Sequence, residues 1–139
     1  MDTGTMAGMR ECTDGSIAGT MTFPEVVQRL RALGAESYRA DLYRREKTYY
    51  LPDGDSFIAP MAVPGTPDLT AAAVPATLSA EGVRAALEAV QRQEIDYVTF
   101  LRRIMAAGAV AYTVHVGGRQ AIYTGRRGDA YVERFPPAL

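Results

Sequence analysis

Two residues of this chain, Asp41 and His115, are of types that carry out acid–base chemistry, and they lie at corresponding positions of two similar stretches. An aspartate can orient an imidazole so that the imidazole acts as a general base. If a two-fold axis relates the two stretches, these side chains would face each other across it. Arg39, Tyr50 and Thr113 would then line the same pocket for a small molecule. The alternative is that a single histidine on a polar strand face is solvated or has a structural role.

Other patterns that support catalysis are weak. No serine has the context of a nucleophile elbow, and no glycine-rich loop joins a strand to a helix where it could hold a phosphate. One histidine and one cysteine give almost no support to a metal site, so we predict neither a metal nor a cofactor. We assign no catalytic residue. Whether the chain is an enzyme therefore stays open, although the sequence favours a non-catalytic role.

The composition is typical of a soluble globular protein, with 47% hydrophobic residues, 22% charged residues and a formal charge of -1. This near-neutral balance argues against nucleic acid as a partner. No stretch approaches the roughly 18 apolar residues of a membrane span, and no secretory signal is recognisable. We therefore predict a cytoplasmic protein. Lys47 is the only lysine, and arginine supplies the other basic residues, a bias typical of a GC-rich genome.

The first residues of the chain look different from the rest. Residues 1–20 are rich in Gly, Thr and Met and lack a hydrophobic period, so we expect a weakly ordered tail there. The alternative is that part of this tail docks as a short helix or strand. We expect residues 21–139 to form a single domain. Within it, four prolines between residues 60 and 78 predict an extended connection over the surface.

A helix followed by three strands is predicted between residues 22 and 59. Thr22 can cap the helix while Glu25 bonds back to it, and Gly34 supplies the left-handed residue that ends it. Polar and apolar residues then alternate, as they do in strands. The predicted strands cover residues 37–42, 48–51 and 56–59.

The same order recurs later in the chain. Asp96 can cap a helix that Gly108 ends, and alternating residues follow. The predicted strands here cover residues 110–116, 121–124 and 130–135. Between the two units, Ser79 caps a further helix that extends to about residue 93.

A shift of 74 positions brings these two units into register without a gap. The window that starts at Thr22 contains 37 residues, of which nine are identical after the shift, including Tyr38 with Tyr112 and Tyr49 with Tyr123. Self-similarity of this kind is a sign of internal duplication. The alternative is two similar units that converged on the same turns and caps. We favour duplication, with repeats over residues 22–58 and 96–132.

The predicted fold is therefore α+β, with two helix-plus-three-stranded-meander repeats, an extra helix between them and antiparallel sheet. Paired positions of an antiparallel ladder share one face. Tyr38 and Tyr49 should lie together on one hairpin, and Tyr112 and Tyr123 on the other. We predict that both pairs face the core against the helices.

Two stretches resemble the YbcV-like family of uncharacterised bacterial proteins. They read YRADLYRREKTYYLPDG from Tyr38 to Gly54 and AGAVAYTVHVGGRQAIYTGRRGDAYVERFP from Ala107 to Pro136. The resemblance covers about residues 21–136, and its closing GRRGDAYVERFP is the most specific part. Some members carry a phage-envelope-like label. The resemblance implies a compact α+β domain and an origin in a mobile element, and it carries over no catalytic residue.

Three functions follow as hypotheses. The first is a non-catalytic binding or interaction domain, with a homodimer formed through an edge strand such as residues 130–135. The second is a small-ligand-binding protein or enzyme with a pocket between the repeats. The third is a structural component of a phage.

Overall fold

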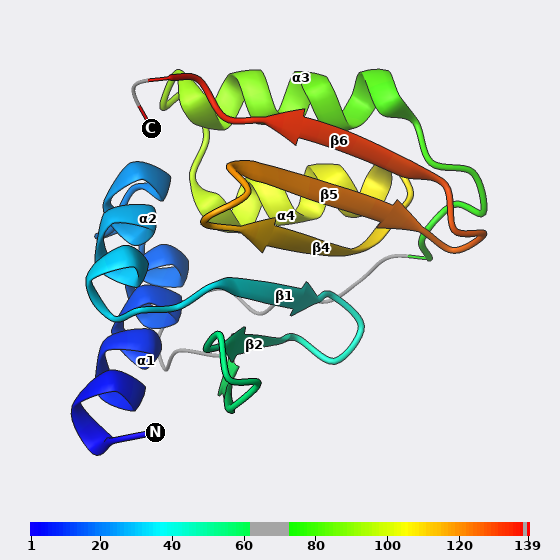
Figure 1. Ribbon diagram of the computed structural model, residues 1–139. Helices are drawn as coiled ribbons and strands as arrows, with labels where there is room; N and C mark the ends of the chain where they lie inside the picture. The colour runs from blue at the N-terminus through cyan, green and yellow to red at the C-terminus, as the bar shows by residue number, and fades with distance from the viewer. Residues whose placement is uncertain (62–72, 138) are drawn as a thin grey trace.

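The structure of the chain is a computed structural model that describes residues 1–61, 73–137 and 139. These residues form four helices and six strands in an α+β arrangement (Figure 1). The helices are α1 (Thr3–Ala18), α2 (Phe23–Ala32), α3 (Ala80–Gln91) and α4 (Tyr97–Ala106). The strands are β1 (Ser37–Asp41), β2 (Glu46–Tyr50), β3 (Ser56–Pro60), β4 (Ala109–His115), β5 (Gln120–Gly125) and β6 (Ala130–Arg134).

The predicted helix caps are confirmed. The Thr22 side chain accepts a hydrogen bond from the Glu25 N–H, and the Glu25 carboxylate accepts one from the Thr22 N–H, which completes a capping box on α2. On α4 the Asp96 carboxylate accepts a bond of 2.8 Å from the Thr99 N–H. These caps fix the point at which each helix begins.

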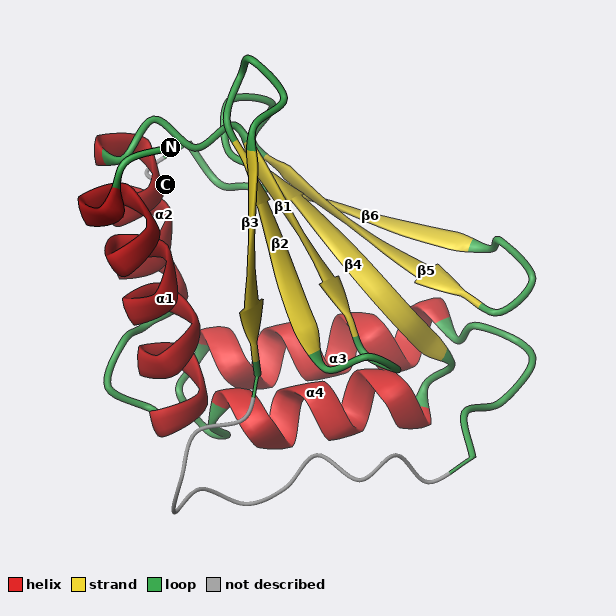
Figure 2. Ribbon diagram, turned by 90° about the horizontal axis from the view of Figure 1, so that it is seen from below, coloured by secondary structure: helices red, strands yellow, loops and turns green. Residues whose placement is uncertain are grey.

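All six strands belong to one antiparallel sheet with the order β3-β2-β1-β4-β5-β6. Each half of the chain supplies one meander, and the meanders join where β1 pairs with β4. The helices lie on one side of the sheet, which leaves its other side uncovered by the helices (Figure 2). We call the helix-covered side the inner face and the other side the outer face.

The two halves have the same strand register. Under the shift of 74 positions the pairing of Tyr38 with Tyr49 becomes that of Tyr112 with Tyr123. The remaining meander pairing also corresponds, because Glu46 pairs with Pro60 and Gln120 with Arg134. Where the halves meet, Arg39 pairs with its own equivalent, Thr113, so a pseudo-two-fold axis passes through this pair. This agreement is consistent with duplication.

Backbone conformation follows the same symmetry. Every described residue with positive φ has a counterpart 74 positions away that also has positive φ. The counterparts are Gly19 and Gln93, Gly34 and Gly108, Arg45 and Arg119, and Gly54 and Gly128. Residues other than glycine rarely adopt positive φ. Arg45 and Arg119 both do so, at 54° and 57°, so the turns that contain them have the same backbone conformation at this position.

The helix between the repeats is not an extra element, and this corrects our sequence prediction. A shift of 74 moves α1 onto residues 77–92, which overlap α3. Each half therefore contains two helices followed by three strands. The sequence comparison began at Thr22 and so omitted the first helix of each half.

The N-terminal stretch is also ordered, in contrast to the weakly ordered tail that we expected. Residues 3–18 form α1, and Met9, Cys12 and Ile17 are buried. Two glycines explain both the packing and the missed prediction. A Cβ on Gly8 would lie 2.7 Å from the Leu33 side chain, and a Cβ on Gly15 would lie 2.6 Å from the Met21 side chain. Glycine lowers helix propensity, but here it allows close contact between α1 and the following segment.

The proline-rich connection predicted for residues 60–78 lies mostly outside the described residues. Its first residue, Pro60, ends β3, and Met61 is buried in the core. At its far end the Ser79 N–H donates to the Ala107 carbonyl, which joins the start of α3 to the end of α4.

Candidate functional site

The inner face of the sheet is lined by tyrosines, as predicted from strand alternation. Tyr38, Tyr49, Tyr112 and Tyr123 are each 4% exposed or less. Within each hairpin the paired rings lie 5.2 Å apart between centroids, and the rings of Tyr38 and Tyr112 lie 6.1 Å apart across the junction. The four rings therefore form one continuous aromatic layer at the pseudo-two-fold axis.

Two hydroxyl groups of this layer are hydrogen-bonded to side chains of the helices that cover it. The Tyr97 hydroxyl, from α4, is hydrogen-bonded to the Tyr112 hydroxyl, and the Tyr49 hydroxyl lies 2.7 Å from the Thr13 hydroxyl of α1. Burial raises the pKa of Tyr38, Tyr97 and Tyr112 well above the ordinary value for tyrosine. These phenols are neutral at physiological pH, so they can donate hydrogen bonds but carry no charge.

One side chain on the inner face is cationic when protonated. Lys47 lies on β2, and its cross-strand neighbours are Ala40 on one side and Ala59 on the other. Alanines leave room for the long side chain, whose ammonium group lies 5.1 Å from the ring centroid of Tyr38 and 4.6 Å from that of Tyr97. Both contacts have the geometry of a cation–π interaction.

Lys47 is almost completely withdrawn from water, with 1% of its surface exposed. Desolvation disfavours the charged form and lowers the pKa of Lys47 to about 7. The Cys12 thiol of α1 opposes this shift weakly. Among the described residues, no carboxylate lies within ion-pair distance of the Lys47 nitrogen. The amine is therefore buried among aromatic rings without a neutralising carboxylate from that part of the chain.

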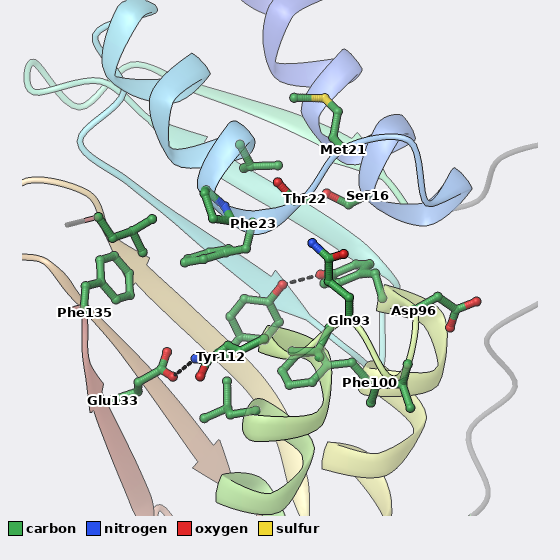
Figure 3. Close-up of a pocket in the computed structure, with 18 of the residues that line it drawn as sticks. Ser16, Met21, Thr22, Phe23, Gln93, Asp96, Phe100, Tyr112, Glu133 and Phe135 are labelled. Carbon is green, nitrogen blue, oxygen red and sulfur yellow. Dashed lines mark hydrogen bonds between the residues drawn. The ribbon is translucent and has the colours of Figure 1, made fainter.

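A cavity of about 520 Å³ lies between the two helix pairs and the inner face. Many of its lining residues come in equivalent pairs from the two halves, such as Met21 with Ile95 and Tyr38 with Tyr112, so the cavity lies at the pseudo-two-fold axis. Figure 3 shows Phe23 and Tyr112 turned toward this space. We call it the central cavity. Lys47 is the only lysine or arginine among its lining residues.

A carboxyl group lines another part of the central cavity. Glu133 on β6 accepts a hydrogen bond of 2.6 Å from the Gln91 side-chain amide (Figure 3). Burial raises the pKa of Glu133. Three strands separate β6 from β2, so the backbones of Glu133 and Lys47 are roughly 19 Å apart at the usual strand spacing. The cavity thus has an amine toward one side, a carboxyl toward the other, and aromatic walls between them.

The five residues predicted to line a ligand site lie elsewhere. Along their strands these residues have the opposite phase to the buried tyrosines, so their side chains belong to the outer face. They are Arg39, Asp41, Tyr50, Thr113 and His115. None of them lines the central cavity. Arg39 and Thr113 are brought together as direct cross-strand partners.

Asp41 and His115 do not face each other. Asp41 is opposite Ala111, whereas His115 is opposite Ser37, so the two are four residues apart along the ladder, about 13 Å. The Asp41 carboxylate instead accepts hydrogen bonds from backbone N–H groups of the turn after β1. The predicted aspartate–histidine pair is wrong because residues equivalent under the shift are opposite each other only at the axis itself.

Lys47, the buried basic residue of the central cavity, was not among the predicted site residues. Lys47 has the same strand phase as Tyr49, two residues on, whose ring was predicted to face the core. A lysine in this phase, in a chain that otherwise uses arginine, was the available signal. The missed acidic residue, Glu133, gave no comparable signal because glutamates also occur at many exposed positions.

The described part of the chain shows neither a metal-binding cluster nor a membrane-spanning helix. No group of three or more His, Cys, Asp or Glu residues there is arranged to hold a metal ion. None of the helices in the same residues combines the length and apolar character needed to cross a membrane.

Comparison with known proteins adds no assignment, because neither a protein-family model nor a curated protein matches this chain. The resemblance to the YbcV-like family and the phage-structural hypothesis therefore stay predictions.

Proposed function

We propose that this protein binds a small molecule in the central cavity. One observation carries the proposal: a cavity of about 520 Å³ at the interface of the two halves is lined mainly by apolar and aromatic side chains and contains one buried amine. Ligand sites typically enclose roughly 300–1,000 Å³ and place a few polar groups in an apolar lining. No carboxylate of the described residues pairs with this amine. Burying an amine without such a partner costs stability, so its retention favours a functional role.

The lining indicates the general character of the ligand. Phe23, Tyr97, Phe100 and Tyr112 offer aromatic surface, which suits a flat or apolar body. The amine of Lys47 suits an acceptor group on the ligand. We therefore expect a largely apolar molecule that carries at least one polar oxygen.

The proposal is tested by filling the cavity. Val90 of α3 lines it, and Val90→Trp should occupy part of the space. Binding of a fluorescent apolar probe, anilinonaphthalene sulfonate, should weaken at least about tenfold, since the probe and the added ring would compete for the same volume. The matched control is Ala85→Trp, an exposed position on the same helix, which should leave binding unchanged. Equal binding by both variants would show that the probe binds elsewhere.

A second candidate is the homodimer predicted from the edge strand. β6 is the last strand of the sheet, and Val132 on its outer face is 44% exposed. An unpaired strand edge with an exposed apolar residue favours pairing with another chain. Light scattering of the purified protein should give a dimer mass that Val132→Lys reduces to that of a monomer. A monomeric wild-type protein would remove this candidate and leave the ligand-binding proposal unaffected.

A further inference from the structure

The position of Lys47 suits it to reaction with a ligand as well as to contact. Its side chain extends between two alanines on the inner face, and its nitrogen lies against the rings of Tyr38 and Tyr97. Both of those tyrosines also line the central cavity, as Lys47 does. The amine is therefore buried from bulk water and adjacent to a space large enough for a small molecule.

The choice of lysine is itself informative. The chain contains 15 lysine and arginine residues, and Lys47 is the only lysine among them. A guanidinium would supply a cation equally well, but it stays protonated in proteins and does not form an imine. Lys47 supplies a primary amine, which can react with a carbonyl compound. An arginine at this position could not replace it in that reaction.

We propose that Lys47 forms an imine with an aldehyde or ketone bound in the central cavity. This inference rests on the proposed ligand-binding function and adds the chemical class of the ligand. The neutral amine attacks the carbonyl carbon and forms a C–N bond. The carbonyl oxygen then leaves as one water molecule with the two amine protons, and a C=N bond remains. Formation of the imine needs no oxidant or reductant.

The surroundings support this reactivity. Because desolvation lowers the pKa of Lys47 to about 7, about half of the amine is neutral at pH 7. An ordinary lysine would be neutral in only about one molecule in 3,000 at that pH. Among the described residues, the groups that face the amine are the Cys12 thiol from α1, the Tyr38 ring from β1 and the Tyr97 ring from α4. None of these carries a negative charge at pH 7 that would hold the amine protonated.

A proton donor is also present in the cavity. The hydroxyls of Tyr97 and Tyr112 are hydrogen-bonded to each other, and Tyr97 contacts the amine through its ring. Because burial raises the pKa of both phenols, both keep their protons at neutral pH. Each hydroxyl has one proton, so the hydroxyl that accepts the bond within this pair has its own proton available to donate to a carbonyl oxygen.

The test is reductive trapping on the full chain. The protein is incubated at pH 7 with cinnamaldehyde and sodium cyanoborohydride, and the product is analysed by intact mass and peptide mapping. We expect one adduct on Lys47, which mapping separates from any adduct on the Met1 α-amino group. Trapping at Lys47 should be at least about tenfold faster in the folded protein than in urea, because unfolding restores an ordinary lysine pKa. Val90→Trp should slow trapping to a similar extent, and Ala85→Trp should not.

Three results would overturn the imine. They are the absence of an adduct on Lys47, trapping in urea as fast as in the folded protein, and trapping that Val90→Trp leaves unchanged. If the fluorescent probe still binds in the cavity while no adduct forms, the imine is wrong and the ligand-binding proposal stands. If Val90→Trp also fails to weaken probe binding, both proposals fail.

Discussion

The two halves of this molecule have one backbone design and two different inner faces. Helix order, strand registers and positive-φ turns all correspond under a shift of 74 positions. The side chains correspond at the aromatic layer, where tyrosines occupy equivalent sites. They differ beside it, since Lys47 in the first half corresponds to Ala121 in the second, and Glu133 in the second corresponds to Ala59 in the first. Shared positions build the scaffold, and these two differing positions give the cavity its amine and the carboxyl of Glu133.

Equivalent glycines offer the sharpest test of how far this likeness extends. Gly34 and Gly108 both have positive φ, so alanine should strain either backbone by about 1 kcal/mol or more. Their surroundings differ, because a Cβ on Gly108 would lie 2.5 Å from the Thr77 carbonyl oxygen, whereas one on Gly34 would have nothing within 4 Å. Urea unfolding should show that Gly108→Ala lowers the free energy of unfolding by about 3 kcal/mol or more, and Gly34→Ala by much less. Equal losses would mean that the close approach at Gly108 is not present in solution.

Replacing Lys47 removes the main ionisable difference on the first half. The pKa of Lys47 is lower in the folded protein than in the unfolded chain, so its protonated form disfavours folding. This destabilisation is fully present below pH 7 and is relieved as pH rises toward the unfolded value near 10.5. Lys47→Met should therefore unfold at higher urea concentration than wild type at pH 7. The difference in free energy of unfolding should shrink by about 1.5 kcal/mol between pH 7 and 8.5.

Between pH 7 and 8.5 the other buried groups with raised pKa contribute little to the change in stability. Burial raises the pKa of Cys12 and of the tyrosines, so these groups begin to affect stability only at higher pH. Subtracting the free energy of unfolding of Lys47→Met from that of wild type cancels the contribution that these groups still make. A difference that does not change with pH would contradict the burial of a titrating amine.

A hydrogen bond present in only one half gives a smaller effect. Tyr49 bonds to Thr13, whereas the residue equivalent to Thr13 in the second half is Leu87. Tyr49→Phe should cost about 1–2 kcal/mol because it leaves the buried Thr13 hydroxyl without this partner. Thermal or urea unfolding of the double variant Thr13→Val with Tyr49→Phe should recover part of that loss. A double variant as unstable as the sum of the single variants would argue against the bond.

The helix caps should behave alike and give the smallest effects. Thr22 and Asp96 occupy equivalent N-cap positions near the surface. Replacing either with alanine should lower the free energy of unfolding by about 1 kcal/mol. Their costs should agree within experimental error, and a large inequality would show that the two helix starts are not equivalent in solution.

Much of the fold could be predicted from residues that act locally. The caps Thr22 and Asp96, the glycines that end their helices, and strand alternation gave the helices and strands of residues 22–58 and 96–132. The phase of Tyr38 and Tyr112 gave the inner face. Helix α1 was not predicted, because Gly8 and Gly15 lower the helix propensity of its sequence. The role of these glycines becomes clear only in the fold, where Leu33 and Met21 pack against them.

The candidate site was less predictable because it depends on where space remains between the covered face of the sheet and the helices. The sequence placed the polar residues Arg39 and His115 together and suggested a site beside them. The helices cover the tyrosine side of the sheet. The cavity lies on that side, next to the single lysine, and not on the side of Arg39 and His115. Strand phase alone tells which residues share a face, but not which face encloses space.

The most direct test of this account is the pKa of Lys47 in the folded protein. Because the chain has one lysine, labelling with carbon-13 at the lysine ε position gives a single side-chain signal that can be followed by NMR across a pH titration. We predict a midpoint near pH 7 for the folded protein, as burial among Tyr38, Tyr97 and Cys12 requires. A midpoint near the ordinary value of 10.5 would show that the amine is solvated, and it would contradict the buried reactive lysine in the central cavity.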